Sequence, residues 1–257
     1  MNAELINKHI VNWIKNYCYN NSMKSLVIGI SGGIDSALTS TLCAETNIKT
    51  IVVSMPIHQN KKQFKLAENH IDWLKKKYHN VESLNINLSS AFDIFKSTVP
   101  NDFRSELALS NSRARLRMMT LYQIASSKNG IVVGTGNKIE DFCIGFFTKY
   151  GDGGVDISPI GDLLKSEVYN LAKNLEIIKE IQIAEPTDGL WEDNRTDYDQ
   201  IGATYEEIEW ALKNLNRIDL NQKEKKLIQL YKKHNQKNSH KMNPIPICLI
   251  PIELKNN

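Results

Sequence analysis

The sequence of 257 residues is poor in cysteine, and its four cysteines are dispersed. They stand at positions 18, 43, 143 and 248, without a CxxC pair or a Cys/His cluster of the zinc-binding type. Dispersed thiols in a chain of this length are typical of reduced, partly buried side chains. The sequence therefore gives no support for a structural metal or for thiol redox chemistry.

An excess of charge of one sign and long apolar runs are also missing. The 32 basic and 29 acidic residues leave a net charge of +3, so bulk charge gives no reason to expect nucleic acid. The longest apolar stretch, near 245–252, is interrupted by proline and is shorter than the roughly 18 residues of a membrane-spanning helix. The N-terminus, MNAELINKHI, lacks the pattern of a signal peptide. We therefore expect a cytoplasmic protein without a membrane or nucleic-acid partner.

Helical and strand patterns alternate through the first 134 residues. Apolar residues recur at helical spacing near 6–17, 36–45, 61–78 and 104–127. Short apolar runs predict strands at 26–30, 50–55, 81–88 and 131–134. This alternation predicts an α/β fold, a doubly wound parallel sheet with helices on both faces. Such sheets bind ligands at the carboxyl ends of their strands, and unusual chemistry follows Ile30 and Val133.

The pattern changes after residue 146. A glycine-rich loop is predicted over 146–159, a helix over 164–175, and a second loop, able to act as a lid, over 185–202. Capping-box patterns at Thr204/Glu207 and Asn221/Glu224 open two further helices. Residues 244–251 are proline-rich and predicted to be extended. Without an interdomain linker, we expect one domain over 1–257 with a C-terminal extension that closes on the substrate.

The segment 29–36, Gly-Ile-Ser-Gly-Gly-Ile-Asp-Ser, lies between a predicted strand and a predicted helix. Free N–H groups and the positive end of the helix dipole make this position suitable for an anion. Gly32 and Gly33 permit close backbone approach, and the hydroxyls of Ser31 and Ser36 can bind phosphate oxygens. Asp35 would repel phosphate, but it is appropriate if it holds Mg²⁺. A tight strand–helix turn is the simpler alternative, and the segment is neither a Walker A loop nor a GxGxxG fingerprint.

This segment resembles the pyrophosphate-binding loop of the N-type ATP pyrophosphatases, which cleave ATP between its α- and β-phosphates. Other segments narrow the resemblance to the ammonia-dependent NAD synthetases. In chain order they are NSRARLRM (111–118), GTGNKIE (134–140), FTKYGDGG (147–154), EPTD (185–188) and the pair His240-Lys241. The resemblance extends from about residue 5 to the end of the chain. It implies an adenine-nucleotide α-hydrolase-like fold.

The resemblance also implies roles for individual residues. It implies two Mg²⁺ ligands, Asp35 and Glu140, and two catalytic side chains, Lys165 on the phosphates and Asp152 to steer ammonium and accept its proton. The implied contacts to deamido-NAD are Arg115, Lys149, Asp156, His240 and Lys241. The implied contacts to ATP are Gly29, Ile30, Ser31, Gly32, Gly33, Ile34, Asp35, Ser36, Thr135, Lys165 and Thr187.

Each of these residues also has a simpler interpretation. Arg113, Arg115 and Arg117 could form a solvated basic face, with Arg113 and Arg117 on one side of a helix. Glu140 and Lys165 could be exposed helical side chains. One position departs from the family pattern, because Tyr198 stands where relatives often carry an acidic residue.

The activity implied is amidation of deamido-NAD through an adenylated nicotinate carboxylate, with AMP and pyrophosphate released. We expect free ammonia as the nitrogen donor, because glutamine-dependent relatives carry an additional amidase domain. The resemblance also implies a homodimer in which both chains build the dinucleotide site. Two alternatives stay open: another N-type ATP pyrophosphatase that adenylates a different carboxylate or a tRNA base, and a nucleotide-binding regulator without turnover.

Overall fold

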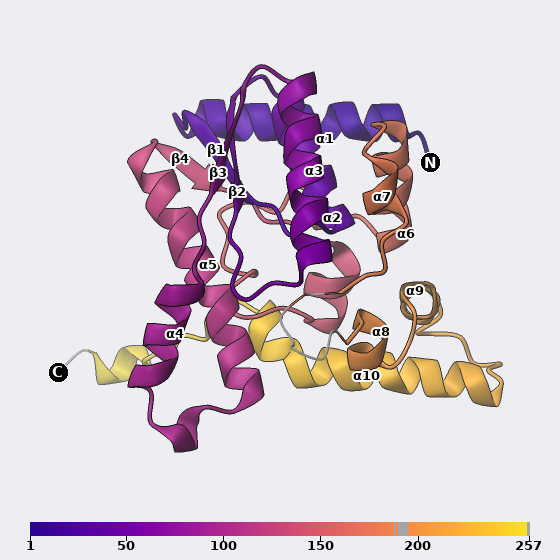
Figure 1. Cartoon of the computed structure of the whole chain (residues 1–257). Coiled ribbons are helices and arrows are strands. Elements are labelled where there is room, and N and C mark those ends of the chain that lie inside the picture. Colours follow the sequence, from indigo (N-terminus) through magenta and orange to yellow (C-terminus); the bar gives the residue numbers. More distant parts are fainter. Residues whose placement is uncertain (188, 190–194, 256–257) are drawn as a thin grey trace.

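The centre of the protein is a parallel sheet of four strands. The computed structural model describes residues 1–187, 189 and 195–255. The strand order is β3-β2-β1-β4, and β1 pairs with both β2 and β4. This arrangement confirms the predicted parallel sheet (Figure 1). The strands are β1 (Ser25–Gly29), β2 (Lys49–Ser54), β3 (Val81–Asn85) and β4 (Gly130–Val132).

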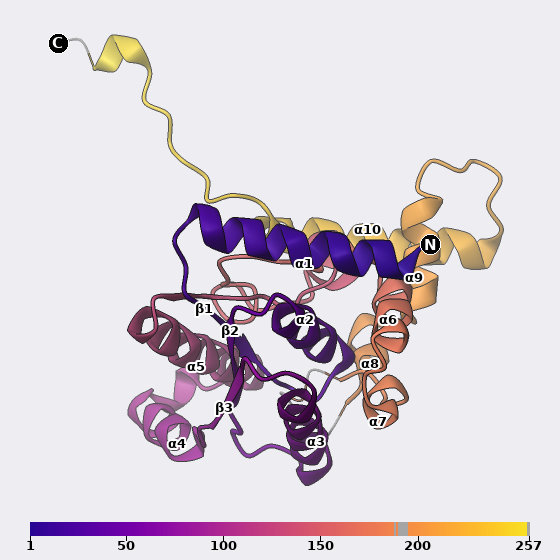
Figure 2. The ribbon, with the colours of Figure 1, turned by 90° about the horizontal axis from the view of Figure 1, so that it is seen from above.

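Helices cover both faces of the sheet (Figure 2). Alternation along β1 explains why, since Leu26 and Ile28 pack into one core and Val27 packs into another. The first core lies under α1 (Ala3–Asn20), α2 (Ile34–Glu45), α3 (Lys61–Lys77) and α6 (Lys165–Asn174). The second lies under α4 (Ser89–Thr98) and α5 (Glu106–Ser127).

A third apolar cluster holds the C-terminal half in place. It joins the π-helix η2 (Lys138–Ile144) to α9 (Tyr205–Lys213) and α10 (Gln222–Met242). The side-chain amides of Asn235 and Asn238 donate to the carbonyls of Cys143 and Ile144. Helix α10 therefore fixes the end of η2, whose first turn carries Glu140. The remaining short helices are η1 (Asn101–Phe103), α7 (Lys179–Gln182), α8 (Asp197–Ile201) and η3 (Ile252–Leu254).

Several sequence-based assignments differ from the structure. Strand β3 ends at Asn85 rather than at residue 88, because α4 begins at Ser89 and its first turn is capped by the side chain of Asn87. Helix α4 itself was not predicted, since only Phe92 of its apolar residues is buried. Helix α8 interrupts the loop predicted over 185–202; residues 188 and 190–194 of that loop lie outside the described residues.

The chain ends in an extended arm, as predicted for 244–251. We call Asn243–Lys255 the C-terminal arm; it follows α10 and leaves the body of the molecule (Figure 2). None of the helices in the described residues is long and apolar enough to cross a lipid bilayer.

Protonation of one core histidine is expected to destabilise the fold in acid. His70 of α3 is fully buried, and burial lowers the pKa of its ring to about 4. The unfolded chain takes up this proton near pH 6.5, so stability is complete above that pH and falls as the pH drops toward 4. The loss due to His70 is about 3 kcal/mol over this range. Urea unfolding at several pH values measures it.

The control for this prediction is a pair of variants. His70→Gln should flatten the pH dependence of stability between pH 6.5 and 4. His58→Gln, at a half-exposed histidine paired with Asp93, should leave the parent dependence in place. Equal slopes in the His70→Gln variant and the parent chain would contradict the assignment.

Candidate active site

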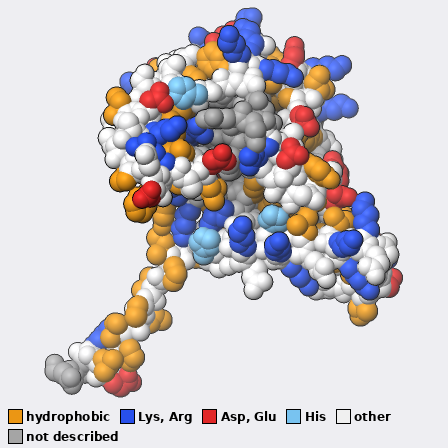
Figure 3. Space-filling view, turned by 60° about the horizontal axis from the view of Figure 1, so that its bottom comes forward, with side chains coloured by type: hydrophobic (Ala, Val, Ile, Leu, Met, Phe, Trp, Pro, Cys, Tyr) orange, Lys and Arg blue, Asp and Glu red, His pale blue; other side chains and the backbone are white. Residues whose placement is uncertain are grey.

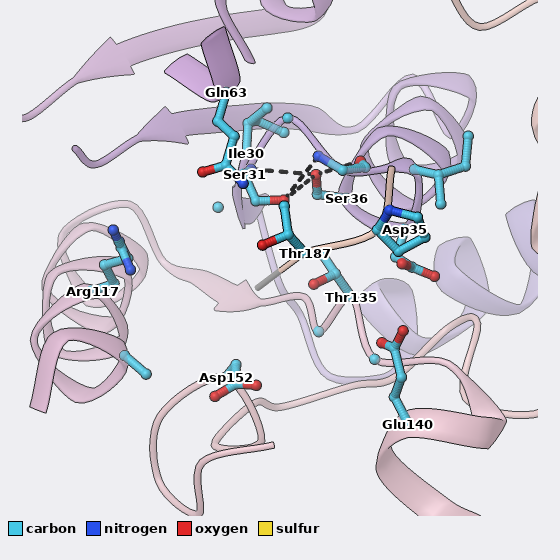
Figure 4. A pocket seen from close by; sticks show the side chains of 18 of the residues that line it. Ile30, Ser31, Asp35, Ser36, Gln63, Arg117, Thr135, Glu140, Asp152 and Thr187 are labelled. Atoms are coloured by element: carbon cyan, nitrogen blue, oxygen red, sulfur yellow. Dashed lines mark hydrogen bonds between the residues drawn. The ribbon is translucent and has the colours of Figure 1, made fainter. Parts of the chain in front are cut away.

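A cavity of about 280 Å³ opens where β1 and β4 end, at the point where the strand order reverses. Its lining includes the whole segment 29–36 and residues from several other parts of the chain (Figure 4). Of the predicted site residues outside that segment, five line it: Thr135, Glu140, Asp152, Lys165 and Thr187. The 29–36 motif and the family resemblance therefore point to residues that line one cavity.

The segment after β1 forms a rigid turn with inward hydrogen bonds. The hydroxyl oxygens of Ser31 and Ser36 lie 3.1 Å apart, and that of Ser31 accepts from the Gly33 N–H at 3.1 Å. Ser36 donates back to the Gly33 carbonyl at 3.0 Å. Gly33 is the N-cap of α2 and has no side chain with which to cap it. The first turn of α2 thus directs N–H groups at the cavity, an arrangement that favours an anion.

Alanine at Gly32 is expected to strain this turn more than alanine at Gly33. Gly32 has a φ of +90°, and a Cβ there would lie 2.7 Å from the Gln63 carbonyl oxygen. We expect Gly32→Ala to lower the unfolding free energy by about 1–3 kcal/mol, which urea unfolding without ligand can measure. Gly33 has a φ of −89°, and the loss there should stay below about 1 kcal/mol. Equal losses in the two variants would contradict this account.

A buried ammonium group joins two carboxylates at the edge of the cavity. Lys165 Nζ lies 2.5 Å from Asp35 Oδ2 and 2.8 Å from Glu140 Oε1. The Lys165 side chain is 5% exposed, and each carboxylate side chain is 16% exposed. Burial opposes the charged form of Lys165, but the nearby charges of Asp35 and Glu140 outweigh it and raise its pKa. Lys165 is therefore a permanent cation at this point.

Neighbouring side chains hold the two carboxylates in position. Asn137, fully buried, donates from Nδ2 to Asp35 Oδ1 at 3.0 Å. Its own Oδ1 accepts from the backbone N–H groups of Ile139 and Glu140, which caps η2. The hydroxyl of Tyr205 lies 2.5 Å from Glu140 Oε1 and 2.7 Å from Asp197 Oδ2.

The sequence analysis did not identify four side chains of this site: Asn137, Asp141, Asp197 and Tyr205. Asn137 could have been found, because Asn three residues before Glu is a helix-capping pattern. Asp141 also lines the cavity, and burial with the charges of Asp152 and Glu140 raises the pKa of its carboxyl well above the usual range. The roles of Tyr205 and Asp197 had no local signal, since they depend on how α8 and α9 pack.

Arg117 also lines the cavity, although the sequence analysis gave it no role in the site. Its Nε donates to the Met55 carbonyl at 3.0 Å. Figure 4 shows it across the cavity from Asp35 and Glu140. The cavity therefore has a cation on each side.

Four predicted contacts to deamido-NAD form a separate cluster outside the cavity lining. Arg115 Nε donates to the Lys149 carbonyl at 3.2 Å, and Lys149 Nζ donates to the His240 carbonyl at 2.9 Å. Lys241 Nζ donates to the Phe147 carbonyl at 2.6 Å. The loop at 147–149 thus links α5 to the end of α10. We call Arg115, Lys149, His240 and Lys241 the basic cluster.

The fifth predicted contact, Asp156, makes other interactions. Its Oδ2 accepts from the Val132 N–H at 2.7 Å, and its Oδ1 accepts from the Tyr122 hydroxyl at 3.1 Å. These contacts hold the end of β4 against α5. A role for Asp156 in binding substrate stays a prediction.

Thr187 and Tyr198 lie within the segment 185–202. The Thr187 hydroxyl donates to the Arg195 carbonyl at 3.1 Å. Thr196 and Asp199 form a capping box that starts α8. This pattern is visible in the sequence, but the sequence analysis predicted a loop here. Tyr198 is 56% exposed, so an acidic side chain at this position would lie in solvent.

Comparisons with known proteins agree with this geometry. The chain is 36% identical over 235 residues to the NH(3)-dependent NAD(+) synthetase of Mycoplasma genitalium, covering 90% of this chain and 92% of that one. Among solved structures, an NMN synthetase from Francisella tularensis superposes with a TM-score of 0.85 at 33% identity, covering 98% and 99%. The NH3-dependent NAD synthetase of Campylobacter jejuni gives a TM-score of 0.79 at 31% identity, covering 97% and 100%.

A family model described as NAD synthase matches residues 6–245, nearly the whole chain. The fold, the glycine-rich turn at 29–36 and the matched length are thus consistent with one another. The chain belongs to the NAD synthase family.

Proposed function

We propose that this chain is an ammonia-dependent NAD synthetase, a ligase that forms a C–N bond. It converts deamido-NAD, ATP and ammonia into NAD, AMP and pyrophosphate. The observation that carries the proposal is the Lys165 ammonium, which lies between Asp35 and Glu140 at the edge of a phosphate-binding turn. Membership of the NAD synthase family supports the same activity.

ATP binds with its phosphates at the turn formed by 29–36. The N–H groups of the first turn of α2 and the hydroxyls of Ser31 and Ser36 face these oxygens, and Thr135 and Thr187 line the same cavity. Lys165 supplies a positive charge beside the turn. These groups offset the charge that builds on pyrophosphate as it leaves.

Two carboxylates fit a Mg²⁺ ion that arrives with ATP. Asp35 and Glu140 already converge on one cation, the Lys165 ammonium. In the part of the chain that the structure describes, no group of three or more His, Cys, Asp or Glu side chains could hold a metal ion by itself. Mg²⁺ commonly takes one or two protein carboxylates and completes its shell with phosphate oxygens and water. When bound, it supplies charge to polarise the phosphates.

The reaction needs an activated carboxylate, because a free carboxylate resists attack by ammonia. The nicotinate carboxylate attacks the α-phosphorus of ATP, and pyrophosphate leaves. Ammonia then attacks the adenylated carbonyl, and AMP leaves. Asp152, which lines the cavity, attracts ammonium and accepts the proton that must be lost before attack. Glu185, Pro186, Thr187 and Asp197 line the cavity and help to exclude water, which would hydrolyse the adenylate.

Deamido-NAD extends from the cavity toward the basic cluster. Arginine and lysine suit its pyrophosphate, because their donors match phosphate oxygens. We also infer a homodimer in which both chains build the dinucleotide site. We further infer that the chain forms one domain over 1–257 and is cytoplasmic. The open cluster at the end of α10 supports a site that a second chain completes.

A different carboxylate substrate is the second candidate. The similarity to an NMN synthetase favours it, because that protein is named for a mononucleotide product. The corresponding substrate here would be deamido-NMN, which carries the same nicotinate carboxylate on one nucleotide instead of two.

An endpoint assay tests both candidates. Purified protein is given MgATP with deamido-NAD or deamido-NMN, and with ammonium or glutamine, and the products are quantified by chromatography. Equal amounts of NAD, AMP and pyrophosphate from deamido-NAD with ammonium, and little NAD with glutamine, are the expected result. Faster amidation of deamido-NMN would establish the second candidate. Neither product and no AMP would remove the proposal.

A further inference from the structure

The Lys165 ammonium lies where a cation shared by Asp35 and Glu140 would have to be. Its Nζ is 2.5 Å from Asp35 Oδ2 and 2.8 Å from Glu140 Oε1. Figure 4 shows the side chains of Asp35 and Glu140 turned toward each other. A metal ion that bridged the same two oxygens would need the space that the nitrogen fills. Lys165 and a bridging metal ion therefore exclude each other.

The other contacts of the two carboxylates come from neutral side chains. Asn137 donates to Asp35 Oδ1 at 3.0 Å, and the Tyr205 hydroxyl donates to Glu140 Oε1 at 2.5 Å. Asn137 is itself held in place, because it caps η2 and is fully buried. Neither contact depends on the cation, so both carboxylates keep their positions when the cation is exchanged. Lysine has a flexible four-carbon stem, so the group that moves is the Lys165 ammonium.

Lys165 depends on these carboxylates for its charge. Of the lysines within the described residues it alone is buried, whereas most lysines of α10 lie in solvent (Figure 3). It is also the first residue of α6, where the helix dipole disfavours a positive charge. The Tyr205 ring, whose centroid is 4.8 Å from Nζ, adds only a weak cation–π attraction. The ammonium cannot leave its carboxylates unless another anion receives it.

The phosphates of ATP supply such an anion. They are expected at the turn formed by 29–36, in the same cavity as Lys165. Without nucleotide, a metal ion at the carboxylates would leave the ammonium buried beside a second positive charge and without a counter-ion. With nucleotide, phosphate oxygens accept the ammonium and also complete the coordination of the metal. The apparent metal affinity of the free chain is therefore lowered to the extent that Lys165 occupies the carboxylates.

One acidic side chain offers Lys165 a different destination. Asp152 also lines the cavity, and its carboxylate could receive the ammonium in place of phosphate. Its Oδ1 already accepts from the Thr148 N–H at 2.9 Å, which ties it to its own loop. Movement of Lys165 to Asp152 would admit a metal ion without nucleotide, so metal binding by the free chain distinguishes the two destinations.

We propose that Lys165 acts as a resident cation that keeps Mg²⁺ out of the Asp35–Glu140 pair until the phosphates of ATP receive its ammonium group. This role of Lys165 deepens the proposed function and rests on its Mg²⁺ site. By linkage, Mg²⁺ and ATP each raise the affinity of the chain for the other by the same factor. Loss of the Lys165 ammonium creates metal affinity in the free chain. A lysine that only contacted phosphate would leave that affinity unchanged.

Titration of the free chain with Mn²⁺, followed by electron paramagnetic resonance without nucleotide, tests the proposal. Lys165→Met should bind Mn²⁺ at least about tenfold more tightly than the parent chain, because the ammonium no longer competes. Lys138→Met is the matched control; it removes an ammonium paired with the exposed Asp162 and should bind as the parent does. The double variant Lys165→Met/Glu140→Gln should lose the gain, because one of the two carboxylates is gone.

The parent chain provides a test that does not depend on the folding of a Lys165 variant. Without nucleotide, the parent and Asp35→Asn should bind Mn²⁺ equally weakly. With a saturating non-hydrolysable ATP analogue, the parent should bind Mn²⁺ at least about tenfold more tightly than Asp35→Asn. Thermal unfolding adds a second readout, because Mg²⁺ alone should raise the Tm of Lys165→Met but not that of the parent.

Two results overturn the proposal. The first is tighter Mn²⁺ binding by the parent than by Asp35→Asn without nucleotide, because Lys165 would then not exclude the metal. The second is a folded Lys165→Met chain that binds Mn²⁺ no more tightly than the parent.

These titrations contain no deamido-NAD, so they separate the role of Lys165 from the proposed function. Nucleotide-dependent metal binding in a chain that forms no NAD retains the role of Lys165 and removes the proposed function. NAD formation by a chain that binds Mn²⁺ at Asp35 without nucleotide does the reverse.

Discussion

An Asp35→Asn variant is expected to form NAD about 1,000-fold more slowly than the parent chain. Asp35 Oδ2 lies 2.5 Å from Lys165 Nζ, and Oδ1 accepts from Asn137 Nδ2 at 3.0 Å. The amide keeps the shape of the carboxylate but removes its charge, so one of the two anions that hold a cation beside the phosphates is lost. Initial rates at saturating ATP, deamido-NAD and ammonium measure the effect.

The matched control removes a carboxylate that has no part in the site. Asp162 pairs with Lys138 at 2.7 Å, but its side chain is 95% exposed. Asp162→Asn should therefore keep the parent rate. Circular dichroism and thermal unfolding show whether Asp35→Asn is still folded. A folded Asp35→Asn variant within tenfold of the parent rate would falsify the role assigned to Asp35.

A Lys165→Met variant is expected to lose about 3–5 kcal/mol of unfolding free energy. The substitution leaves Asp35 and Glu140, each 16% exposed, facing each other without their cation. Two carboxylates at this degree of burial repel each other and lack the solvent that would screen them. Urea unfolding at neutral pH without nucleotide measures the loss.

Charge removal at all three positions provides the decisive comparison. The triple variant Lys165→Met/Asp35→Asn/Glu140→Gln should recover most of the stability, because no buried charge is left unpaired. Lys138→Met, at the exposed pair with Asp162, should cause no measurable change. If the triple variant were no more stable than Lys165→Met, unpaired charge could not be the cause of the loss.

Local patterns in the sequence were sufficient to predict the turn at 29–36. A buried strand, two glycines and a helix start occur within 25–36, and each depends on neighbouring residues only. The resemblance placed Asp35 and Glu140 in one site, and the structure brings both to Lys165, because both follow parallel strands whose ends meet at one edge.

Contacts between distant elements explain what the sequence could not reveal. Lys165 was predicted to contact phosphate, and its position between two carboxylates depends on the packing of α6 beside α2. Tyr205 reaches Glu140 from a helix that starts 65 residues later. Helix α4 was missed because its outward face carries Ile94 and Phe95 instead of the polar residues of an ordinary amphipathic helix.

The ion pair between Lys165 and Asp35 joins side chains that lie 130 residues apart in the chain. A ribosome adds about 5–20 residues per second, so the carboxylate emerges roughly 7–26 s before its cation. Strand β1 and helix α2 can form during this interval. Asp35 must meanwhile keep its contact with water, because burial of an unpaired carboxylate costs several kcal/mol. The edge of the sheet that carries Asp35 therefore closes late in synthesis, only after α6 has left the ribosome.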